Sequence, residues 1–170
     1  IEANKVKEFT VVADAAMISK ENVKELIQNN INYIVGARLG NIPSSQLENI
    51  DKNIRREDGK SIRIKTDNGY LICSYSSVRY RKDLYDMNKQ IEKAKQVVEK
   101  PSKSKKLKFT KTNNHQLEIN EVLVEKTKKL LGIKGYYTNL EASVADNKMI
   151  IERYHELYKI EQAFRISKSD

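Results

Sequence analysis

The sequence predicts an α/β protein, and three features support this class. An apolar strand-like run, a helix and a second strand-like run follow one another in residues 8–35. A two-stranded hairpin is predicted in residues 61–75, and long amphipathic helices are predicted in residues 79–99 and 147–168. Such alternation favours a sheet covered by helices over an all-α or all-β fold. The length of 170 residues suits one domain, or one domain that carries a subdomain.

The first predicted strand, Glu8–Ala13, is a continuous β-prone run, as in strands that are buried on both faces. Asp14 follows it directly. Functional groups of open α/β sheets gather at the carboxyl ends of strands, so Asp14 is a candidate site residue; a turn or cap acid is the alternative. Ser19 is suited to cap a helix through Asn29, and residues 31–35 form the second strand. This connection predicts parallel pairing of the two strands.

The predicted hairpin is the clearest local signal in the middle of the chain. Residues 36–59 before it are less regular, with a short helix predicted from Pro43. Residues 61–66 alternate with period two, and Asp67-Asn-Gly69 is typical of a tight hairpin turn. Cys73 lies in the returning strand and is predicted to be a buried apolar thiol. A single cysteine excludes an intramolecular disulfide.

A long helix and a basic segment follow. The apolar residues of 79–99 recur at helical spacing and should face a core. Its basic side chains lie mostly off that stripe; a solvated face is the usual interpretation, and contact with a DNA backbone is the alternative. A basic loop over 100–106, a strand near 107–111, a helix over 120–131 and a strand over 133–138 complete this part.

The charge of the chain is strongly positive and unevenly distributed. Its net charge of +9 favours nucleic acid or another polyanion as partner, with an inert basic surface as the alternative. Val78–Lys111 holds twelve Lys/Arg and four Asp/Glu, which is most of the excess. Within it, Lys103, Lys105 and Lys106 are predicted to contact DNA. We expect a cytoplasmic protein without a membrane span, because no apolar run of 18 residues and no signal peptide is recognisable.

The last predicted helix places an acid on its apolar face. At about 100° per residue, an arc of roughly 80° that should face the core contains Ile150, Tyr154, Leu157, Glu161, Phe164 and Lys168. A buried carboxylate must be paired, hydrogen-bonded or bound to a cation, because burying it bare is costly. Two interpretations are open: Glu161 pairs with Lys168 or Arg165, or Glu161 binds a metal ion.

The spacing of four residues in this helix resembles a known signature. Tyr154, Leu157, Glu161 and Lys168 match the order Tyr, two residues, Arg, three residues, Glu, six residues, Lys. That order marks DDE-type transposases of bacterial insertion sequences, in the insertion-sequence-four superfamily. The chain departs from the signature at Leu157, where the family has Arg, and Arg165 is a candidate substitute for the lost phosphate contact.

Two further motifs resemble the same family and occur in the matching order. Val11–Ser19, which contains Asp14, resembles the second-aspartate block, although Ala16 and Ser19 depart from it. Gly135–Asn139 resembles the strand that precedes the glutamate helix. The resemblance therefore covers essentially the whole chain. The length of sequence between Asp14 and Glu161 suits a family member with a β-rich insertion between these two acids.

The resemblance implies a domain plan and a chemistry. Residues 1–35 and 133–170 would form part of a ribonuclease-H-like core, and residues 36–132 an insertion subdomain with the hairpin and the basic helix. Asp14 and Glu161 would be catalytic carboxylates of a two-metal site that holds Mg²⁺ for DNA cleavage and strand transfer.

The same resemblance implies partners. Tyr154, Arg165 and Lys168 would contact double-stranded DNA, either transposon ends or target, and the enzyme would act as a homodimer. No residue matches the family's first aspartate, so we expect a catalytic-domain fragment that is inactive by itself. The alternative is a non-catalytic basic nucleic-acid-binding module or a decayed transposase remnant, with Val78–Lys111 as its footprint.

Overall fold

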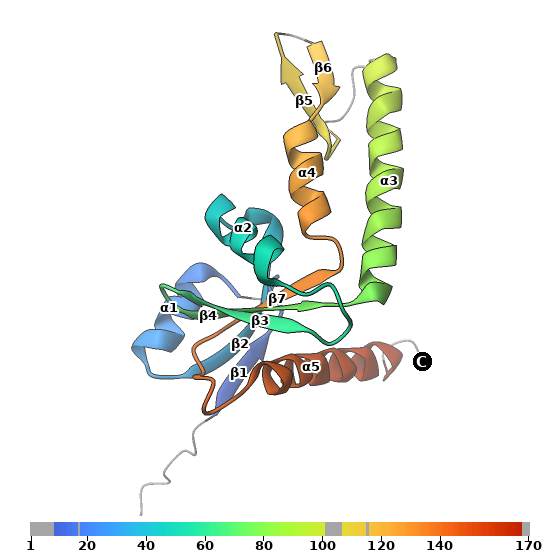
Figure 1. Ribbon diagram of the computed structural model, residues 1–170. Helices are drawn as coiled ribbons and strands as arrows, with labels where there is room; N and C mark the ends of the chain where they lie inside the picture. Colours follow the sequence, from blue (N-terminus) through green and yellow to red (C-terminus); the bar gives the residue numbers. More distant parts are fainter. Residues whose placement is uncertain (1–8, 17, 101–106, 115, 168–170) are drawn as a thin grey trace, which may run out of the picture. The chain divides into compact units, whose positions relative to one another are not determined.

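The chain is mixed α/β, as predicted, and divides into two compact units (Figure 1). The computed structural model describes residues 9–16, 18–100, 107–114 and 116–167; for residues 158 and 160–167 it describes the backbone only. Unit 1 comprises residues 1–38, 61–74 and 134–170, and unit 2 comprises residues 39–60 and 75–133. The chain thus leaves unit 1 twice and returns to it twice.

Unit 1 is built on a five-stranded sheet in the order β1-β2-β7-β4-β3. β1 and β2 are parallel, which confirms the prediction, whereas β2–β7 and β3–β4 are antiparallel. The helix α1 (Lys20–Gln28) connects β1 to β2, and the Ser19 hydroxyl caps it by accepting the N–H of Asn22. The strands are β1 (Thr10–Ala13), β2 (Asn32–Ala37), β3 (Ser61–Thr66), β4 (Gly69–Tyr75) and β7 (Ile133–Thr138).

The β3–β4 hairpin has the predicted turn and joins the sheet of unit 1. Thr66 pairs with Gly69, which leaves two residues in the turn. Gly69 has φ +124°, and a Cβ there would lie 2.9 Å from the Cα of Asn139 and closer still to the Thr138 carbonyl oxygen. Glycine is therefore required where this turn meets the end of β7. The hairpin, expected in the insertion, belongs to unit 1 because β4 pairs with β7.

The helix α5 (Asn147–Ser167) packs on this sheet and closes the core of unit 1. Ile150 and Tyr154, which the sequence places on its apolar face, are buried, with exposed fractions of 0% and 6%. Cys73 is also buried, and desolvation raises the pKa of its thiol to about 12, in agreement with the prediction of an apolar thiol. The buried core cluster of this unit is Ile34, Ile72, Tyr136, Leu140, Ala145, Ile150 and Tyr154.

Unit 2 is a helical unit with a small hairpin. Its elements are a short 3-10 helix (Leu39–Asn41), α2 (Ser44–Asn53), α3 (Ser77–Glu99), β5 (Thr110–Asn113), β6 (Gln116–Ile119) and α4 (Glu121–Lys129). Its buried core cluster is Met87, Ala94, Phe109, Val124 and Leu131. β5 begins later than the strand predicted near residues 107–111, and β6 was not predicted. A four-residue strand carries little local signal, and β6 exists through its pairing with β5.

Across the described ranges, no helix combines the length and the apolar character that crossing a bilayer requires.

Candidate functional site

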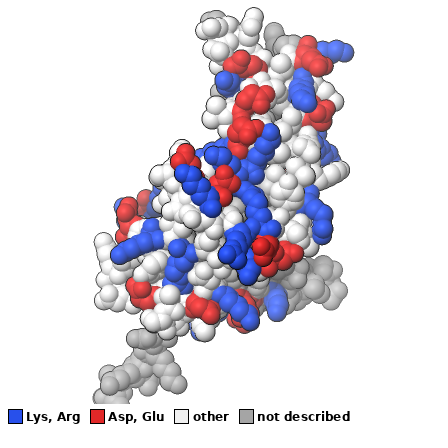
Figure 2. Space-filling view, viewed as in Figure 1, with Lys and Arg blue, Asp and Glu red and all other residues white. Residues whose placement is uncertain are grey.

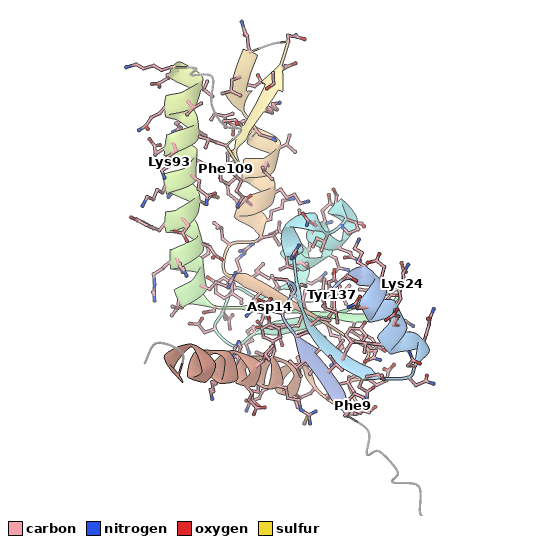
Figure 3. The ribbon with its side chains drawn as sticks, turned by 180° about the vertical axis from the view of Figure 1, so that it is seen from behind. Phe9, Asp14, Lys24, Lys93, Phe109 and Tyr137 are labelled. Carbon is pink, nitrogen blue, oxygen red and sulfur yellow. The ribbon has the colours of Figure 1, made fainter. Side chains whose placement is uncertain are left out.

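Asp14 lies at the carboxyl end of β1, the end opposite Phe9 (Figure 3). There it meets α5, because the Tyr154 hydroxyl donates a hydrogen bond to Asp14 Oδ1 at 3.2 Å. The ring of Tyr154 is buried, and Asp14 is half-buried. Two residues that the sequence singled out, 140 positions apart, are thus brought together at one end of one strand.

Gly36 makes this contact possible. It lies in β2, the strand beside β1, and a Cβ at this position would be 2.7 Å from Tyr154 Oη and 3.2 Å from the backbone nitrogen of Ala15. Only a residue without a side chain lets the hydroxyl pass over β2 to Asp14. Sequence reasoning missed Gly36, which it placed in an irregular segment; a glycine next to an apolar strand run was the available signal.

Two residues of β7 fix the ring of Tyr154. Tyr136 meets it edge to face, with centroids 4.9 Å apart and an angle of 66° between the rings. Lys134 Nζ lies 4.4 Å from the centroid of the Tyr154 ring and 5.5 Å from that of Tyr136, which is cation–π geometry. The sequence did not single out Lys134. With the ring held by both neighbours, the direction of the Tyr154 hydroxyl toward Asp14 is set by packing.

His155 lies beside this cluster and is electrostatically coupled to it. Its Nε2 is 3.4 Å from the Tyr136 hydroxyl oxygen. Desolvation of the imidazole, together with the positive charges of Lys134 and Lys159, lowers the pKa of His155. The neutral imidazole is therefore the form that the folded state favours.

The lowered pKa of His155 predicts a small loss of stability in mild acid. The unfolded chain, whose histidine titrates near pH ~6.5, takes up the proton first. The stability that the folded state gains by holding His155 neutral is therefore present above that pH and is lost as the pH falls below it. In urea unfolding at pH 7.5, 6.5 and 5.5, the fall in the free energy of unfolding toward acid pH should be smaller in His155→Gln than in the wild type. An identical fall in the His155→Gln variant would contradict this assignment.

The remaining predicted site residues lie partly or wholly outside the described part of the chain. Glu161 and Arg165 belong to α5, but the structure describes only their backbone. The Cα of Glu161 follows Tyr154 by seven residues, hence by about two turns and ~10 Å, on nearly the same face of the helix. Leu157, between them, is half-buried. Outside the described residues lie Lys168, Lys103, Lys105 and Lys106.

The donor chemistry of Asp14 suits a hard cation such as Mg²⁺. A carboxylate offers about four acceptor sites, so the one hydrogen bond that the described residues donate to Asp14 leaves capacity for a metal ion. Among the described residues, no three His, Cys, Asp or Glu side chains are grouped as a metal site would require. Asp14 by itself offers one hard ligand, and the other described residues do not complete a metal site around it.

No family model, no curated protein and no solved structure matches this chain. The assignment of the site consequently rests on the chain's own residues and their geometry.

Proposed function

We propose that this chain is part of the catalytic domain of a DDE-type transposase, which cleaves transposon DNA and joins it to a target. The observation that carries the proposal is the hydrogen bond from Tyr154 to Asp14. Asp14 belongs to the segment that resembles the family's second-aspartate block, and Tyr154 is the first residue of the signature in the glutamate helix. The contact brings the two segments that resemble the family's motifs to the carboxyl end of one strand.

The course of the chain supports this proposal. In the parallel β1–α1–β2 unit, Asp14 lies at the carboxyl end of β1, and α5 packs on the same sheet. All of unit 2, residues 39–60 and 75–133, lies between Asp14 and Glu161 in sequence, as an insertion between the two acids would. We propose a ribonuclease-H-like core for unit 1 on these grounds.

The proposed roles follow from the chemistry of the side chains. Asp14 and Glu161 would hold divalent ions, normally Mg²⁺, which supply activation of water or a DNA 3′-hydroxyl for attack at phosphorus. Tyr154 orients the Asp14 carboxylate through its hydroxyl. Its contact with DNA stays a prediction, as do those of Arg165 and Lys168. Double-stranded DNA is the proposed substrate, and action as a homodimer is a further prediction.

Binding of Mn²⁺, a paramagnetic substitute for Mg²⁺, tests this proposal. We expect NMR signals of Asp14 and Glu161 to broaden together during the titration, because one ion would be shared by both carboxylates. Asp14→Asn and Glu161→Gln should each weaken Mn²⁺ binding by about tenfold or more, since loss of even a supporting residue typically costs 10–100-fold. Glu156→Gln, a nearby exposed acid of α5, is the matched control and should leave the affinity unchanged. Equal affinities in all three variants would refute the shared site.

A further inference from the structure

Helix α3 of unit 2 has two faces with opposite character. Met87 and Ala94 are buried in the core of the unit, and Tyr80, Leu84 and Ile91 pack against it. On the opposite side, an arc of about 80° holds six exposed residues, the uncharged Gln96 and five that we call the α3 stripe. These are Val78, Lys82, Tyr85, Lys89 and Lys93, the last of which is labelled in Figure 3.

An exposed tyrosine stands among the lysines of the α3 stripe. The side chain of Tyr85 is 66% exposed, and Lys89 Nζ lies 5.9 Å from its ring centroid. Neither the apolar periodicity of the helix nor the core of the unit accounts for an aromatic residue at this position. Lysine ammonium groups and tyrosine hydroxyls are donors that proteins present to phosphate oxygens.

Two other cations of α3 form ion pairs, whereas the lysines of the stripe form none among the described residues. Elsewhere on α3, Arg79 pairs with Asp83 at 3.3 Å and Lys95 with Glu92 at 3.1 Å. In the described ranges, the three lysines of the stripe form no ion pair, although the exposed Asp86 borders them. Figure 2 shows Lys and Arg side chains along α3, with acidic ones between some of them.

The spacing of the lysines suits an extended polyanion. Lys82 and Lys93 are eleven residues apart, which is about 16 Å along the helix axis. One strand of a DNA duplex carries a phosphate every ~3.4 Å along its axis, so the stripe spans about five phosphates. The exposed face of a helix is convex, and it can lie along a backbone but cannot enclose a small anion.

We propose that the α3 stripe binds the sugar–phosphate backbone of double-stranded DNA. Lys82, Lys89 and Lys93 neutralise phosphates, and the Tyr85 hydroxyl donates a hydrogen bond to a phosphate oxygen. This binding needs neither Asp14 nor a metal ion and is independent of base sequence. A test of this binding is therefore independent of a test of the proposed catalytic function.

Fluorescence anisotropy with a labelled 25-base-pair duplex, in EDTA, tests the proposal. The variant Lys82→Gln/Lys89→Gln/Lys93→Gln should bind at least about tenfold more weakly, with the slope of log K against log salt reduced by about 2 to 3, because each neutralised phosphate contributes about 0.9. The control, Lys95→Gln/Lys111→Gln/Lys128→Gln, removes the same charge from lysines that are paired with Glu92, Glu118 and Glu125. It should retain an affinity near that of the wild type.

Two further comparisons sharpen the result. Tyr85→Phe should weaken binding without changing the circular dichroism spectrum, because the side chain is exposed. Asp14→Asn should bind DNA as the wild type does. Equal weakening by the two triple variants would show diffuse attraction to the whole basic surface and overturn the proposal. Tighter binding of single-stranded DNA or RNA than of the duplex would also overturn it.

Discussion

Replacing Arg63 with leucine should lower the free energy of unfolding by about 3 kcal/mol, because three hydrogen bonds to a charged donor are lost. The guanidinium donates to Asn147 Oδ1 at 3.0 Å, to the Leu140 carbonyl at 2.9 Å and to the Ala145 carbonyl at 2.6 Å. It also lies over the ring of Tyr70, 5.0 Å from the centroid. Leucine leaves these acceptors without their donor in a partly buried segment.

The stability that Arg63 contributes should depend on the geometry of its three hydrogen bonds. Its bonds tie the segment between β7 and α5, and the first residue of α5, to β3. Arg63→Lys keeps the charge but loses the planar fork of donors, and it should give an intermediate loss. Lys65→Leu, an exposed cation of the same strand, is the matched control in urea unfolding. Equal losses of unfolding free energy for Arg63→Leu and Lys65→Leu would show that the three hydrogen bonds do not contribute to stability.

Replacing Gly36 with alanine should lower the free energy of unfolding by about 2–3 kcal/mol, the upper range for overpacking a core. The added Cβ would lie 2.7 Å from Tyr154 Oη and 3.3 Å from Tyr154 Cζ. The ring cannot simply turn away, because Tyr136 packs edge-on against it. Urea unfolding measures the loss, and Gly40→Ala, where no atom lies within 4 Å of the new Cβ, is the matched control.

The double variant Gly36→Ala/Tyr154→Phe tests whether the collision with the Tyr154 hydroxyl causes this loss of stability. Removing the hydroxyl removes the closest collision, so the double variant should recover most of the stability that Gly36→Ala loses. The two residues should therefore couple in a double-mutant cycle. Under the proposed function, the double variant should still bind Mn²⁺ more weakly than the wild type, because Asp14 lacks its hydrogen bond. No recovery of stability would show that the collision with Ala15, at 3.2 Å, dominates.

Most helices and strands were predictable because their signals are local. The Ser19 cap, the Asp67-Asn-Gly69 turn and the apolar stripe of α3 each act within a few residues. The predicted burial of Cys73 also followed from its apolar neighbours in one strand. Such short-range energies can be read from spacing alone. For the candidate site, the sequence singled out Asp14 as the acid after a strand that it predicted to be buried; β1 is instead an edge strand whose residues are half-buried.

Only the tertiary structure decided which of these segments meet. The pairing of β7 with β2 and β4, the contact of Tyr154 with Asp14, and the place of Gly36 beneath it join residues far apart in sequence. Likewise, Arg63 binds carbonyls about 80 residues away, and no local pattern marks such a partner. These contacts depend on the packing of the whole unit, in which each pairing is stable only when the others are present. A sequence pattern records which face of a segment is apolar, but not which other segment covers it.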